Sequence, residues 1–133
     1  IILLSLLVFT LVSCDYWDDR LKVVNKLDQD FYLIAYDTTS LNDYPNKVLT
    51  LDPISADTLK SMLQMNTTWE NTIRSARNKK INLFILDVDT VNHYSRDNII
   101  KNKRYLRILS YSLSEIKRMD WKIVLDSNSL GYK

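Results

Sequence analysis

The chain has 133 residues, with 18 lysines and arginines against 16 aspartates and glutamates, which gives a formal net charge of +2. With a single cysteine and a single histidine, it can form neither an intramolecular disulfide nor a multi-histidine metal site. Its length suits one domain with its own hydrophobic core.

The chain begins with an uncharged apolar segment that ends at the only cysteine, Cys14. Every position from 1 to 12 is apolar except Ser5 and Thr10. This run is shorter than the roughly 20 residues that cross a bilayer, so it predicts the core of a signal peptide. Since no initiator methionine or basic segment precedes it, we expect residues 1–13 to be a signal peptide truncated at its start.

The residues before Cys14 resemble the lipobox of bacterial lipoproteins, with Leu11 three positions upstream and the small Ser13 immediately upstream. The resemblance implies that Cys14 is lipidated and becomes the mature N-terminus. The protein would then be held in the cell envelope at the outer membrane, on its periplasmic or its surface face. The alternative is an ordinary secretory signal with an incidental cysteine. Residues 14–20 (CDYWDDR) are expected to form a solvated acidic tether, similar to the acidic signals of surface lipoproteins in Bacteroidota.

Residues 21–126 are expected to form one mainly β (α+β) domain, an antiparallel sandwich or open barrel with short helices in its connections, followed by a tail at 127–133. Alternating and β-branched patterns predict the strands. The candidates are residues 21–27, 31–37, 47–51, 81–88, 105–112 and 121–126. The run 83–86 is apolar throughout, which indicates a central strand buried on both faces. Because the chain has only one glycine, its turns are expected to use Asn and Asp.

Helices are predicted mainly from their caps. Thr67 with Glu70, and Ser112 with Glu115, have the spacing of a capping box. Ser95 is expected to cap a third helix. A weaker helical pattern covers residues 57–65, where Leu59, Met62 and Leu63 share one side of a helix. Trp69 and Trp121 stand at positions expected of the core.

The segment LFILDVDTV (residues 83–91) resembles the nucleophile loop of the haloacid-dehalogenase-like phosphohydrolases. The resemblance implies that Asp87 attacks phosphorus, that Asp89 acts as acid and base, and that Mg²⁺ binds beside them. Ser110, Lys117 and Asp126 follow in the order of the later motifs of this family.

Three features argue against this activity. Asp126 is followed by Ser127 and Asn128, whereas the family uses a pair of acids there. The connection between the last two predicted strands is barely long enough for a parallel crossover. The nucleophile strand normally opens that fold, but here much of the domain precedes it. We therefore expect a non-catalytic protein without cofactor or metal, and keep the phosphohydrolase as the alternative.

A metal site built from Asp87, Asp89 and His93 is a further alternative. We expect instead that these side chains form a solvated cluster in a loop. The basic segment 101–107 is interpreted as a solvated face, because export makes nucleic acid an unsuitable partner.

The order of several motifs resembles small lipoproteins of gut Bacteroidota that have no established activity. These motifs are the W-E helix start at 69–70, D-x-D-T at 87–90, K-R-Y at 103–105 and LSEIKRMDWKI at 113–123. The resemblance implies the compartment and the fold only. The expected partners are the membrane, through the N-terminal lipid, and an envelope protein or a glycan.

Exported proteins of that phylum carry O-glycans at an aspartate followed by serine or threonine and a small or aliphatic residue. Three threonines match this pattern, and the resemblance implies that they are candidate acceptors. They are Thr38, Thr58 and Thr90. The sequence thus predicts a lipid-anchored envelope protein with a binding or structural role and an unknown ligand.

Overall fold

The computed structural model describes residues 16–36 and 52–131, and this part of the chain has a mainly β, α+β fold. This confirms the predicted fold class. The strands are β1 (Trp17–Asp18), β2 (Lys22–Asn25), β3 (Phe31–Tyr36), β4 (Leu59–Ser61), β5 (Gln64–Met65), β6 (Lys80–Asp87), β7 (Arg107–Ser112) and β8 (Lys122–Leu125). The helices are α1 (Trp69–Ser75), α2 (Val88–His93), α3 (Arg96–Lys101), α4 (Leu113–Arg118) and α5 (Ser127–Leu130).

The described strands form three small sheets, in the orders β1-β5, β4-β2-β8 and β3-β6-β7. Strand β6 is antiparallel to both of its neighbours. The expectation of antiparallel pairing throughout is wrong for β2 and β8, which pair in parallel with Val23 opposite Ile123. These two strands come from opposite ends of the domain. Since the rest of the fold connects them, no hairpin constrains their direction.

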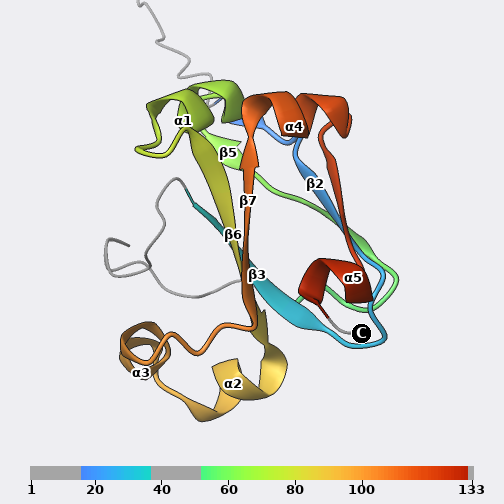
Figure 1. The fold of residues 1–133 in the computed structure, drawn as a ribbon, viewed down its shortest axis with the longest axis vertical. Coiled ribbons are helices and arrows are strands. Elements are labelled where there is room, and N and C mark those ends of the chain that lie inside the picture. Colours follow the sequence, from blue (N-terminus) through green and yellow to red (C-terminus); the bar gives the residue numbers. More distant parts are fainter. Residues whose placement is uncertain (1–15, 37–51, 132–133) are drawn as a thin grey trace, which may run out of the picture.

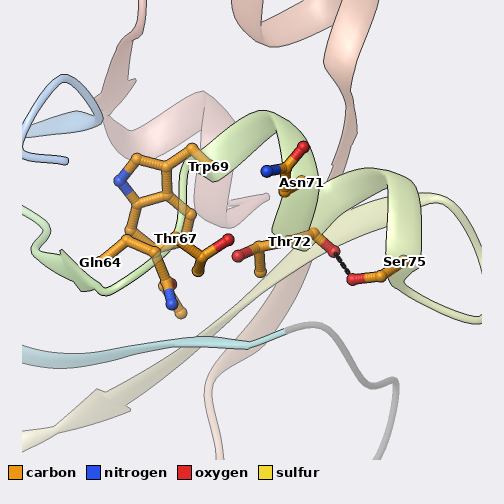
Figure 2. Close-up of a pocket in the computed structure, with 7 residues that line it drawn as sticks. Gln64, Thr67, Trp69, Asn71, Thr72 and Ser75 are labelled. Atoms are coloured by element: carbon orange, nitrogen blue, oxygen red, sulfur yellow. Dashed lines mark hydrogen bonds between the residues drawn. The ribbon is translucent and has the colours of Figure 1, made fainter. Parts of the chain in front are cut away.

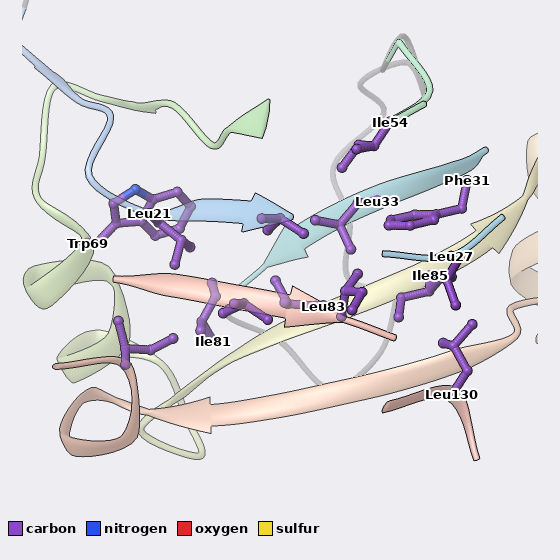
Figure 3. Packing of buried hydrophobic residues seen from close by; sticks show 14 of the residues in the cluster. Leu21, Leu27, Phe31, Leu33, Ile54, Trp69, Ile81, Leu83, Ile85 and Leu130 are labelled. Atoms are coloured by element: carbon purple, nitrogen blue, oxygen red, sulfur yellow. The ribbon is translucent and has the colours of Figure 1, made fainter. Parts of the chain in front are cut away.

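The main core lies between the two three-stranded sheets (Figure 3). One side of β6 contributes Ile81, Leu83 and Ile85, and the facing sheet contributes Val23 and Ile123 among others. Helices α1 and α4 lie at one end of the β3-β6-β7 sheet, and α2 and α3 lie at the other (Figure 1). The buried side chains of α1 and α4 close the core at their end.

A second, smaller core covers the opposite face of the β3-β6-β7 sheet. Phe84 and Leu86 of β6 pack there with Ile34 and with Ile99 of α3. The ring of Tyr105 meets that of Phe84 edge to face, with centroids 5.6 Å apart. Residues 81–86 are therefore all buried, which confirms the predicted central strand with two buried faces.

Most predicted strands are present with slightly different ends, but one lies outside the described residues, at 47–51. The helix predicted over 57–65 is wrong, because this segment forms β4 and β5. Asp57 has a φ of 55°, which interrupts a right-handed helix, and Val24 of β2 pairs with Leu59. Pairing with β2 outweighs the helical spacing of Leu59, Met62 and Leu63, of which the first and last are exposed and Met62 packs against the main core.

Tight turns in this protein use residues other than glycine, as the composition predicts. Asp57, Asn66 and Asp120 adopt the left-handed conformation, as expected for Asn and Asp. Lys79 and Lys103 also have positive φ, which the expectation for Asn and Asp does not cover. Trp121 also has a positive φ, of 59°, directly after Asp120. The two residues form the turn between α4 and β8, in which the Lys122 N–H donates to the Met119 carbonyl at 3.0 Å.

The folded unit extends beyond residues 21–126 at both ends. Asp18, expected in a solvated tether, is 2% exposed and belongs to β1. Leu130, expected in a tail, lies in α5 and packs into the main core. Tertiary contacts hold the segments of Asp18 and Leu130 in the folded unit, and the polar composition of these segments does not predict such contacts.

Candidate functional site

Asp87 caps a helix in this structure. Its side chain accepts hydrogen bonds from the backbone N–H of Asp89 at 2.7 Å and of Thr90 at 3.4 Å, and from the Thr90 hydroxyl. The DVDT segment is therefore the start of α2, and the expected loop is wrong. Burial opposes ionisation of Asp87, but these bonds outweigh it and hold the pKa of its carboxyl below the usual value.

The other residues of the phosphohydrolase motif do not converge on Asp87. Ser110 pairs with Asn82 across the sheet, five residues from Asp87 along β6, which corresponds to roughly 17 Å. Lys117 belongs to α4, at the far end of the sheet (Figure 1). Asp126 caps α5 and accepts from the Ser129 N–H at 2.8 Å. Because β7 is antiparallel to β6, their carboxyl ends lie at opposite edges of the sheet.

The alternative metal site is not formed in the described part of the chain. The His93 Nδ1 lies 2.8 Å from the Asp89 carbonyl oxygen, at the end of α2. Within residues 16–36 and 52–131, no group of three or more His, Cys, Asp or Glu side chains is placed to hold a metal ion.

The candidate modification sites differ in their surroundings. Thr58 is exposed in the segment before β4, and its hydroxyl donates to the Ser55 carbonyl at 2.6 Å. Thr90 is half-buried in α2, with its hydroxyl bonded to Asp87. Thr38 and Cys14 lie outside the described residues.

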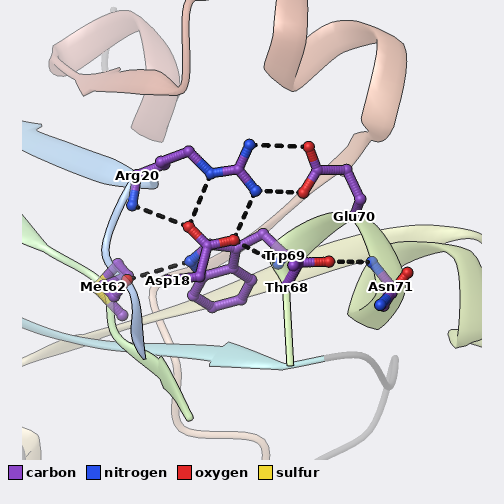
Figure 4. Close-up of polar contacts among 7 residues, drawn as sticks. All are labelled: Asp18, Arg20, Met62, Thr68, Trp69, Glu70 and Asn71. Atoms are coloured by element: carbon purple, nitrogen blue, oxygen red, sulfur yellow. Dashed lines mark hydrogen bonds and ion pairs between the residues drawn. The ribbon is translucent and has the colours of Figure 1, made fainter. Parts of the chain in front are cut away.

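A polar network joins β1 to the start of α1 (Figure 4). The Arg20 guanidinium donates to Asp18 through Nε at 2.8 Å and Nη2 at 2.7 Å, and to Glu70 through both terminal nitrogens. Asp18 also accepts from the Trp69 backbone N–H at 2.9 Å. The guanidinium carbon lies 4.4 Å from the centroid of the Trp121 ring. Arg20 therefore links β1, α1 and the turn before β8.

The charges of this network stabilise one another. The bonds from Arg20 lower the pKa of Asp18 to about 2, although its burial opposes this, and the Trp69 N–H adds to the lowering. Arg20 also holds the pKa of Glu70 below its usual value, and the two carboxylates raise the pKa of Arg20. The network is thus fully ionised at neutral pH.

A cleft of about 510 Å³ lies beside α1 (Figure 2). Its lining comes from β3, β5, the turn before α1 and α1 itself. The lining residues are Ala35, Gln64, Thr67, Trp69, Asn71, Thr72 and Ser75. This volume lies within the range of small-molecule sites.

The chemistry of the cleft is neutral and rich in hydrogen-bonding groups. Three hydroxyls and two carboxamides can donate and accept. The Trp69 side chain is 2% exposed and belongs to the main core, so it offers the cleft little aromatic surface. Figure 2 shows Thr67 and Thr72 among the side chains that line the cleft. Among the described residues that line it, every side chain is uncharged. The cleft can therefore hold an uncharged polar molecule.

Sequence reasoning missed both the network and the cleft. Glu70 was expected to complete a capping box with Thr67, but its carboxylate pairs with Arg20, and Thr68 caps α1. Arg20 and Glu70 are 50 residues apart in the chain, so no local pattern indicates their contact. Gln64 falls within the helix predicted over 57–65 but belongs to β5. For the network, the one local signal in the sequence is the adjacent opposite charges of D-D-R at 18–20.

The chain matches no protein-family model, and comparisons with curated proteins and with solved structures give no significant match. Among the described residues, none of the helices is both long enough and apolar enough to cross a membrane.

Proposed function

We propose that this protein is a lipid-anchored component of the cell envelope whose domain binds a neutral, hydroxyl-rich ligand without transforming it. The lipobox-like segment ending at Cys14 supports the anchor and the compartment. The uncharged cleft beside α1 supports the ligand class and is the observation on which the binding role depends. The proposed ligand is an oligosaccharide.

Oligosaccharides suit this cleft for two chemical reasons. Their hydroxyls both donate and accept, as do the hydroxyls and carboxamides of Thr67, Thr72 and Asn71. They also carry no charge, which matches the uncharged side chains of the described residues that line the cleft. An anion would meet no lysine or arginine among the described lining residues.

Calorimetric titration of the purified full chain with a panel of neutral and acidic oligosaccharides tests this proposal. We expect binding of a neutral member and weaker binding of acidic ones. Asn71→Asp places a charge in the cleft without changing side-chain size, and is expected to weaken binding by about tenfold, or ~1.4 kcal/mol.

Asn92→Asp makes the same chemical change on α2, at the other end of β6 from α1, and serves as the matched control. Its affinity should equal that of the wild type. Equal effects of the two substitutions, or the absence of binding to every neutral oligosaccharide, would refute the cleft as the ligand site.

A further inference from the structure

Exposed apolar side chains lie on the small β1-β5 sheet and at Leu63, directly before β5. We define the β1–β5 patch as Trp17, Leu63 and Met65, which are 48%, 58% and 53% exposed. Trp17 and Met65 are direct cross-strand partners, so their side chains share one face of the sheet. Tyr16, 51% exposed, precedes Trp17. Large apolar side chains grouped at a surface mark a contact with a partner or with lipid.

The β1–β5 patch lies very close in the chain to the proposed lipid anchor. Two residues, Asp15 and Tyr16, separate Trp17 from Cys14, and the three peptide units between them span at most about 11 Å. Acyl chains on Cys14 would therefore enter a bilayer within that distance of Trp17.

The β1 segment is also held firmly against the domain. The Asp18 side chain is buried, and Arg20 joins it to Glu70 of α1. The Asn66 N–H donates to the Tyr16 carbonyl at 2.8 Å, which continues the pairing of β1 with β5. Segment 16–20 is thus part of the folded unit, and no long tether separates the domain from residue 14.

We propose that the β1–β5 patch rests on the membrane interface, so that lipidation at Cys14 seats the whole domain directly on the bilayer. This inference depends on the anchor in the proposed function. The side chains fit such a surface, because Trp and Tyr favour the boundary between lipid and water while Leu and Met favour its apolar side. Covalent attachment of the anchor brings the patch to the bilayer at a high effective concentration.

The orientation leaves the cleft accessible. Asp18 and Gln64 are the other cross-strand pair of this sheet and face opposite to Trp17 and Met65. Gln64 lines the cleft and Asp18 is buried in the domain. A bilayer against the β1–β5 patch therefore leaves the cleft facing away from it.

The experiment uses the full lipidated chain in vesicles of zwitterionic phosphatidylcholine. A polarity-sensitive nitrobenzoxadiazole dye is attached to Leu63→Cys, because lipidation of Cys14 leaves the introduced cysteine as the free thiol. We expect a severalfold rise and a blue shift of its emission on reconstitution. The dye on Asn92→Cys, at the exposed surface of α2, should show neither change.

Incorporation of labelled palmitate, and its loss in Cys14→Ala, is measured on the same samples. If labelling fails, the proposed anchor fails and this inference fails with it. If labelling succeeds but the Leu63 dye responds no more than the Asn92 dye, the anchor stands and membrane seating is refuted. Self-association of the lipidated chain through the β1–β5 patch, with the Leu63 dye shielded from lipid-soluble quenchers, would also refute it.

Discussion

At the scale of single residues, Arg20 connects three segments of the fold. Its planar guanidinium donates to two carboxylates at once and also lies over the Trp121 ring. A lysine could not reproduce this, because its ammonium group lacks the fork of parallel N–H donors. The buried Asp18 needs this partner, since an unpaired buried charge is costly.

We expect the stability of the protein to fall at acidic pH through Asp18. The pKa of its carboxyl is about 2 in the folded state and returns toward 3.8 on unfolding. The folded state therefore binds fewer protons between these values, and ionised Asp18 stabilises it. This contribution, about 2 kcal/mol, is complete above about pH 4 and is lost as pH falls through about 2. Urea denaturation at a series of pH values measures it.

The matched variants are Asp18→Asn and Asp19→Asn. The first removes the buried carboxylate, so its stability deficit should be largest near neutrality and should shrink as the pH falls. The second changes an exposed neighbour and should show the pH dependence of the wild type. A deficit in Asp18→Asn that is constant with pH would contradict this assignment.

At the scale of elements, the helices are short and depend on their caps. Those within residues 16–36 and 52–131 have between four and seven residues, too few for stability on their own. Each begins after a polar residue whose side chain accepts from the first turn. These residues are Thr68, Asp87, Ser95, Ser112 and Asp126.

Two adjacent threonines allow the cap of α1 to be tested. Thr68 accepts from the Asn71 N–H at 3.1 Å, so Thr68→Ala is expected to lower the free energy of unfolding by about 1 kcal/mol. The capping-box spacing favours Thr67 as the cap, but its hydroxyl lines the cleft. Thr67→Ala should therefore lower the free energy of unfolding by less than about 0.5 kcal/mol. Thermal or urea denaturation of both variants compares them. A larger loss in Thr67→Ala would restore Thr67 as the cap.

At the scale of the whole molecule, β6 joins two cores. Leu83 and Ile85 belong to the main core and Phe84 to the second, so alternate residues of one strand pack on opposite faces. Damage to either core should therefore destabilise the other, and the domain is expected to unfold in one cooperative step.

Ile99→Ala tests this coupling from the second core. The side chain is 1% exposed, so its truncation should cost roughly 2–5 kcal/mol. Trp69 and Trp121 lie in or against the main core, so their fluorescence reports on a different part of the molecule than Ile99. We expect fluorescence and far-UV circular dichroism to shift to the same lower urea midpoint.

Lys101→Ala, on the exposed face of the same helix, should change stability by no more than about 0.5 kcal/mol. In Ile99→Ala, a circular dichroism change that precedes the fluorescence change would mean that α2 and α3 melt separately, contrary to the expectation.

The sequence by itself determined the elements whose signals are local. The apolar run 83–86 predicted the strand with two buried faces, and Ser95 and the Ser112–Glu115 capping box were found where expected. These predictions succeed because periodicity and caps depend on neighbouring residues. The α+β class followed from them.

Only the tertiary structure decided the pairing of the strands and the surroundings of the site residues. The parallel pairing of β2 with β8, the pairing of β4 with β2 and the hydrogen bond from the Trp69 N–H to Asp18 all join segments far apart in the chain. The resemblance of Asp87 to a nucleophile rests on nine consecutive residues, and it does not show where the other residues of the motif lie. Asp87 caps α2 through local hydrogen bonds, whereas its separation from Ser110 and Lys117 follows from strand direction. Strand direction is set by which surfaces pack together across the fold, and a local pattern does not contain that information.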